Sequence, residues 1–103
     1  MHKESALVAL QTIDVIVYKS GHREVGQGEK AELREACRRL TQSVQDEPDV
    51  AKRAAWIVGL VQAGFLESVD RASSHRDEIL KCGISLSLYL QREVGGGGDF
   101  SAG

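Results

Sequence analysis

The chain has 103 residues, a length that suits one domain with a single hydrophobic core. Apolar residues make up 42% and charged residues 27%, a balance that excludes a wholly disordered chain. The formal net charge of −2 lacks the basic excess that is typical of proteins holding nucleic acid through its phosphates.

The first predicted helix covers residues 5–19, where apolar side chains recur at helical spacing. Lys19 suits the last turn of this helix, and Gly21 suits the cap that follows it. A β-strand over residues 13–17 is the alternative, because β-branched residues cluster there. We favour the helix, since the sequence offers no second strand with which such a strand would pair.

Three glycines predict a loop over residues 20–28, and an amphipathic helix follows over residues 29–45. The apolar residues of this second helix form one narrow stripe, which predicts a helix on the outside of the domain. A basic stripe runs beside it, and Arg39, Lys52 and Arg53 extend the basic set. The basic stripe consists of Lys30, Arg34 and Arg38.

Residues 54–66 are apolar at every position except Gln62. A helix that is apolar all round must be covered on every side, and thirteen residues are too few to cross a membrane. We therefore predict a central helix over residues 48–66, with 72 as its outer limit, covered by its own chain and by a second copy. Pro48 suits its first turn. If Trp56 lies in the core its loss is costly, and if it is exposed it is a candidate binding anchor.

The last predicted helix runs from Ser74 to Glu93 and has one apolar face directed at the core. It also carries a second apolar stripe, which consists of Leu80, Ile84 and Leu88. Residues 95–103 are rich in glycine and predict a flexible tail outside a single helical domain of residues 1–94. The predicted fold is all-α: a bundle of four helices, or five if residues 65–72 separate from the central one.

No catalytic, metal or cofactor site is predicted, because each motif lacks a required part. The glycines at 21 and 26 have P-loop spacing, but Gln27 and Gly28 stand where lysine and serine or threonine are needed. The three histidines lack the spacing of paired metal ligands. Nucleophile pairs can be imagined, and nothing in the sequence favours either of them. These pairs are Cys37 with His22 and Ser74 with His75.

Both cysteines, Cys37 and Cys82, fall among apolar residues at helical spacing, which predicts buried free thiols. A disulfide would need an oxidising compartment, and no secretory signal pattern opens the sequence. We therefore expect a cytoplasmic protein that is not membrane-bound.

The chain has more apolar stripes than one bundle needs. Val8 and Val15 lie on the polar back of the first helix, in addition to the second stripe of the last helix. Large exposed apolar patches are rare on monomers, so we expect a second copy, in a homodimer, or another protein to cover this surface. The alternative is that the last helix lies between two others and buries both of its stripes internally.

These features predict a non-enzymatic helical regulator that binds and inhibits or sequesters another protein, as anti-activators, immunity proteins and secretion chaperones do. The predicted interface is Val8, Val15, Leu80, Ile84 and Leu88. The alternative is a small nucleic-acid-binding protein that uses Lys30, Arg34 and Arg38, a stripe that would equally dock an acidic protein patch. A third hypothesis, a small-molecule or enzymatic domain, would place its pocket near Trp56.

Overall fold

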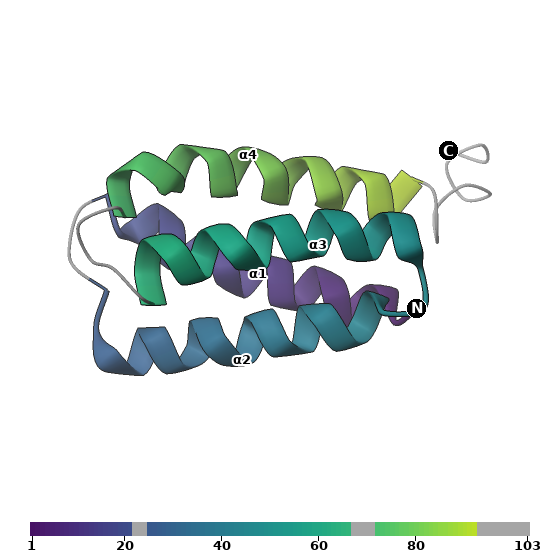
Figure 1. Cartoon of the computed structure of the whole chain (residues 1–103), viewed down its shortest axis with the longest axis horizontal. Coiled ribbons are helices and arrows are strands. Elements are labelled where there is room, and N and C mark those ends of the chain that lie inside the picture. Colours follow the sequence, from purple (N-terminus) through teal and green to yellow (C-terminus); the bar gives the residue numbers. More distant parts are fainter. Residues whose placement is uncertain (22–24, 67–71, 93–103) are drawn as a thin grey trace.

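The structure is a computed structural model that describes residues 1–21, 25–66 and 72–92, with the backbone alone at 72–74. Four α-helices run alternately up and down, and a π-helical turn, η1, continues the third (Figure 1). Their bounds are α1 (Lys3–Lys19), α2 (Gln27–Val44), α3 (Pro48–Val61), η1 (Gln62–Leu66) and α4 (Ala72–Leu90). The all-α prediction is confirmed, and residues 13–17 are helical. The predicted tail at 95–103 lies outside the described residues.

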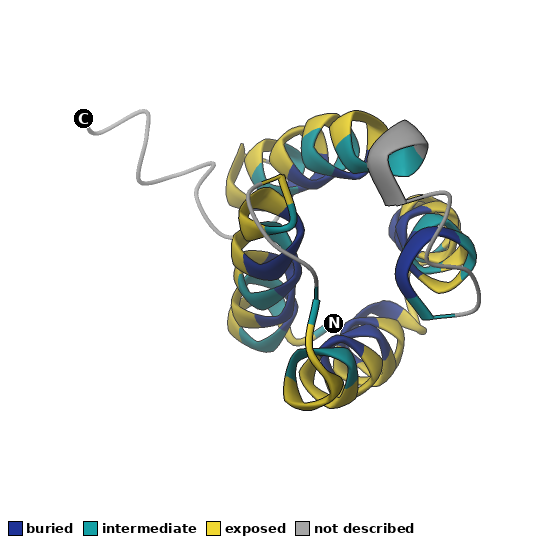
Figure 2. Cartoon of the chain, turned by 90° about the vertical axis from the view of Figure 1, so that its left-hand side faces the viewer, coloured by how far each residue is buried: buried dark blue, intermediate teal, exposed yellow. Residues whose placement is uncertain are grey.

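The four helices form a ring in which each packs against two neighbours, in the order α1, α2, α3, α4 and back to α1 (Figure 2). Helix α3 is therefore one corner of the ring. Its Ala55, Trp56 and Gly59 are exposed, so the chain by itself does not cover this helix on every side as predicted. The physical reason is that a four-membered ring gives every helix an outer side.

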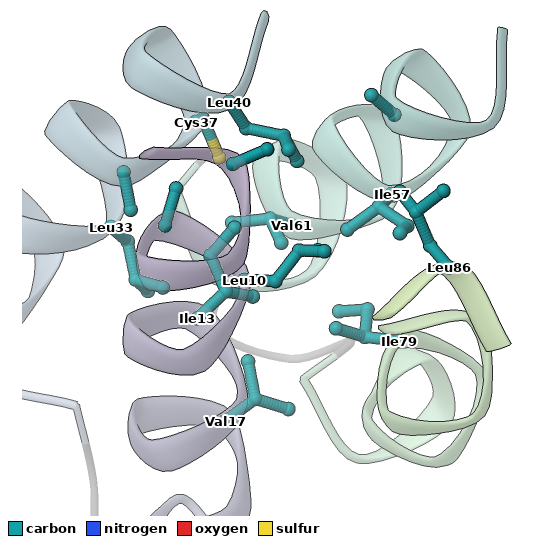
Figure 3. Packing of buried hydrophobic residues seen from close by; sticks show 14 of the residues in the cluster. Leu10, Ile13, Val17, Leu33, Cys37, Leu40, Ile57, Val61, Ile79 and Leu86 are labelled. Carbon is teal, nitrogen blue, oxygen red and sulfur yellow. The ribbon is translucent and has the colours of Figure 1, made fainter. Parts of the chain in front are cut away.

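The core lies along the axis of the ring, where an apolar stripe from each helix points inward (Figure 3). Helix α1 contributes Leu10 and Ile13, and α2 contributes Leu33 and Leu40, all at most 1% exposed. Burying a side chain of this size is worth about 1.5–3 kcal/mol relative to leaving it in water. The inward stripes of α3 and α4 include Ile57, Val61, Ile79 and Leu86.

The helix ends follow the local sequence. Helix α2 begins two residues before the prediction, because the Glu29 carboxylate accepts a hydrogen bond of 3.1 Å from the Gly26 N–H and caps the first turn. Pro48 opens α3 as predicted, since the first turn does not need its missing N–H. The start of α1 is held to the end of α2, where the His2 N–H donates to the Ser43 carbonyl at 2.9 Å.

Gly21 does not cap α1 in the way the sequence suggested. The helix ends at Ser20 in a right-handed conformation, and no described glycine has a positive φ. A Cβ at position 21 would lie 2.8 Å from the guanidinium of Arg76. That guanidinium donates to the Tyr18 carbonyl at 3.1 Å, so glycine at position 21 leaves room for the Arg76 side chain, whose flexible end would otherwise have to shift.

Candidate functional site

Large exposed apolar side chains gather on three of the four helices. Each of the six is between 45% and 58% exposed. They are Val8, Val15 and Tyr18 on α1, Trp56 on α3, and Ile84 and Leu88 on α4. Among the described residues, α2 contributes none. Because α4 packs between α1 and α3, the exposed apolar residues lie on α4 and its two neighbours.

Four of the five predicted interface residues lie on the outside of neighbouring helices. We name Val8, Val15, Ile84 and Leu88 the outer α1/α4 residues. Leu80 differs from the prediction, because it is half-buried and packs against the core. It directly follows the buried Ile79, and one residue turns a helix by only about 100°, so Leu80 stays at the edge of the buried face.

A groove of about 580 Å³ runs between α3 and α4. Its lining, which we name the α3/α4 groove, is Lys52, Arg53, Trp56, Ile57, Lys81, Cys82, Ser85 and Leu86. The Trp56 side chain is 58% exposed, which excludes the core alternative for this residue and leaves the binding-anchor alternative. The pocket expected near Trp56 is thus an open groove on the surface of the bundle.

The cations of this groove have no acidic partner in the described part of the chain. Lys52, Arg53 and Lys81 form no ion pair within 4 Å with any described carboxylate. The Arg53 guanidinium lies over the Tyr89 ring, 4.5 Å from its centroid, in a cation–π contact. Three positive charges therefore border an apolar surface without an ion pair to any described carboxylate.

Cys82, on the α4 side of the groove, is half-buried and not fully buried as predicted. Burial raises the pKa of its thiol, and the neighbouring Glu78 raises it further. The Sγ atom donates to Glu78 Oε2 at 3.5 Å. The group is thus a neutral thiol at pH 7 and a weak nucleophile.

One of the three residues of the predicted basic stripe on α2, Arg38, is neutralised by an acidic neighbour. Arg38 pairs with Glu35 through Nη2 and donates from Nε to Glu35 Oε1 at 3.2 Å. This hydrogen bond is the main cause that holds the pKa of Glu35 below its ordinary value. Arg39 lies 3.7 Å from the same carboxylate. The stripe thus presents fewer free charges than its sequence suggests.

The stripe also lies apart from the other features. Arg34 and Arg38 line a second groove of about 500 Å³ between α2 and α3, together with Val58 and Gln62. Lys52 and Arg53 do not extend the stripe, because they lie on the side of α3 that faces α4. The structure therefore separates the predicted basic set into two groups.

The remaining reactive groups offer little chemistry. Burial raises the pKa of the Cys37 thiol to about 11, and His22, its imagined partner, lies outside the described residues. The Ser74 side chain also lies outside them. Within the described ranges no three His, Cys, Asp or Glu side chains cluster as metal ligands would. No described helix has both the length and the apolar character that crossing a bilayer requires.

No known protein family, curated protein or solved structure matches this chain. The features that sequence reasoning missed are the α3/α4 groove and its free cations. Lys81 directly precedes Cys82, and Lys52 lies four residues before Trp56, so the sequence of each helix places a lysine near a residue that lines the groove. What the sequence lacked was the pairing of α3 with α4, which brings the two sets together.

Proposed function

We propose that this chain is a non-enzymatic helical regulator that binds another protein and inhibits or sequesters it. The observation that supports this best is the set of six exposed large apolar side chains, which stand on α1, α3 and α4 and not on the described α2. Single apolar residues are normal on a protein surface, but several exposed large apolar side chains on neighbouring helices are typical of interaction sites. We propose a cytoplasmic location and no cofactor.

We propose further that the chain forms a homodimer through the outer α1/α4 residues. A two-fold axis would place each apolar side chain against its counterparts in the second copy. A partner protein that displaces one copy would then take over the same contacts. The outer α1/α4 residues would then be shielded from water both in the free homodimer and in the complex with the partner protein.

The test is Ile84→Asp, with Ala31→Asp on the exposed side of α2 as its control. Both positions are exposed, so each variant should keep its helical circular dichroism and its stability within about 0.5 kcal/mol. The unchanged protein and the control should have twice the 11.2 kDa chain mass in solution. The Ile84→Asp protein should be a monomer and should lose the protein captured from the native cell. A monomeric unchanged protein that captures nothing would refute the proposal.

A further inference from the structure

The α3/α4 groove combines an apolar floor with an aromatic side chain and free cations. Ile57 and Leu86 form the floor and are both 1% exposed. Trp56, with more than half of its surface in water, stands beside them. Exposed tryptophan next to an apolar floor is costly in water and is among the residues most enriched at binding hot spots. The groove therefore offers an apolar anchor point.

The charge around this anchor selects the partner. Lys52, Arg53 and Lys81 all line the groove, and none pairs with a described carboxylate within 4 Å. In the α2/α3 groove, by contrast, one of the two arginines, Arg38, is already paired with Glu35. Complementary charge at the rim of an interface steers association and sets orientation. An acidic segment fits the α3/α4 groove, and a basic one does not.

A second copy of this chain is a poor occupant. A two-fold contact through this groove would place Lys52, Arg53 and Lys81 against the same three cations of the other copy. Like charges brought together across an interface are destabilising. Self-association therefore has to use another surface, and the groove stays open for a different molecule.

Nucleic acid is also a poorer fit than protein. Phosphate backbones need a track of cations, whereas three cations here surround a floor of Ile57 and Leu86. The chain as a whole carries a net charge of −2, which repels a polyanion. An amphipathic helix, in contrast, presents an apolar stripe with charged flanks, and a groove between two helices is a common seat for one.

We propose that the α3/α4 groove binds an acidic amphipathic helix of a partner protein. An apolar side chain of that helix contacts Trp56 and the groove floor, and its flanking carboxylates pair with Lys52, Arg53 and Lys81. This inference rests on the proposed protein-binding function and names the site and the chemistry of the partner.

Trp56 makes the test direct, because it is the only tryptophan of the chain and its fluorescence reports on the groove. The probes are two hydrocarbon-stapled peptides of about 16 residues, or roughly four helical turns. They share one apolar face of leucine and phenylalanine, and they carry either glutamate or lysine on its flanks. The glutamate peptide should shift Trp56 emission to shorter wavelength and bind about tenfold or more tightly than the lysine peptide. Its affinity should fall as salt rises.

A charge-reversed variant identifies the site. In Lys52→Glu/Lys81→Glu the preference should invert, so that the lysine peptide binds more tightly. Both side chains are exposed, and circular dichroism should show an unchanged fold. The matched control, Lys30→Glu/Arg34→Glu, makes the same charge change on α2 and should keep the preference of the unchanged protein.

Three results would overturn the inference: equal affinity for both peptides, an unchanged preference in the Lys52→Glu/Lys81→Glu protein, or tighter binding of a single-stranded oligonucleotide. These failures are separable from failure of the proposed function. If the groove discriminates no peptide while Ile84→Asp still abolishes capture of a cellular protein, only the groove assignment falls. If the unchanged protein is a monomer that captures nothing, the regulator proposal falls whatever the peptides do.

Discussion

Asp14 is a half-buried acidic group with no hydrogen-bond or ion-pair partner among the described residues, and its replacement should stabilise the protein. The residue lies on the side of α1 that faces α4, against Gly83. Its Oδ1 atom is buried and accepts no hydrogen bond. Arg76, the α4 cation that packs on α1, reaches the Tyr18 carbonyl instead. Burial raises the pKa of Asp14 from 3.8 to about 6, because the charged form loses its water.

The sign of the effect on stability follows from this direction. Below pH 3.8 the carboxyl is protonated in the folded and unfolded states alike, so folding does not have to remove a charged carboxylate from water. As pH rises through about 6, the unfolded chain ionises more easily than the folded one, so the free energy of unfolding decreases. The full difference corresponds to about 3 kcal/mol. Part of the side chain still meets water, and we therefore expect about 1–2 kcal/mol.

The assay is denaturant unfolding followed by circular dichroism between pH 4 and pH 8, on the unchanged protein and on Asp14→Asn. At pH 8 the variant should be more stable by about 1–2 kcal/mol. The advantage should shrink towards pH 4, where the carboxyl of Asp14 becomes neutral. The control is Asp46→Asn, whose carboxylate pairs with the terminal amine of Met1 at 2.7 Å and has a lowered pKa. Its replacement should destabilise or do nothing at pH 8. Stability curves that stay parallel across this pH range would refute the reasoning.

The neighbouring glycine provides an independent check of the same contact. A Cβ at position 83 would lie 2.5 Å from Asp14 Oδ1, so Gly83→Ala alone should gain nothing from its better helix propensity. With Asp14→Ala in the same chain, that space is free, and Gly83→Ala should add about 1 kcal/mol. A double-mutant cycle with no coupling between the two positions would contradict the packing of α1 on α4 described above.

Two further predictions concern α3 and η1. A Cβ at Gly59 would meet nothing within 4 Å, so Gly59→Ala should raise the free energy of unfolding by about 1 kcal/mol. A Cβ at Gly64 would lie 3.0 Å from the Cβ of His75, so Gly64→Ala should bring no gain. Equal effects of the two substitutions in thermal melts would argue against this packing. Trp56→Ala should cost less than about 1 kcal/mol in the same melts, and a loss of about 3–5 kcal/mol would mean that Trp56 is core after all.

Periodicity predicted the helices and most of the core, because an inward stripe depends on spacing within a single helix. All six apolar positions of α1 that repeat at helical spacing are buried, and so is the stripe of α2. The exposure of Trp56, which the sequence left open, has a different origin. Whether Trp56 is exposed depends on how many helices pack against α3. The composition of residues 54–66 carries no information about how the four helices are arranged.

The candidate sites could be predicted only where one helix holds the whole feature. Val8, Val15, Ile84 and Leu88 were predicted from their own helices and are exposed. The α3/α4 groove needs Lys52 and Lys81 to meet across two helices, and the order of helices around a ring is a tertiary property. Gly21 shows the same limit for a single contact, because the side chain that a Cβ at this position would meet, Arg76, belongs to another helix.

The α1/α4 pair, which carries the outer α1/α4 residues, is also the part of the described fold that holds unsatisfied buried polar atoms. The two buried polar side-chain atoms without a described hydrogen-bond partner, Asp14 Oδ1 and Arg76 Nε, belong to α1 and α4. Unsatisfied buried groups lower the cost of opening a segment, and binding elements are commonly drawn from the less stable parts of a fold. We expect amide hydrogen exchange to be faster in α4 than in α2 at pH 7. In Asp14→Asn the difference should narrow, because the charge that penalises the closed α1/α4 contact is gone. Equal protection of α2 and α4 in the unchanged protein would mean that these orphaned atoms do not weaken that contact.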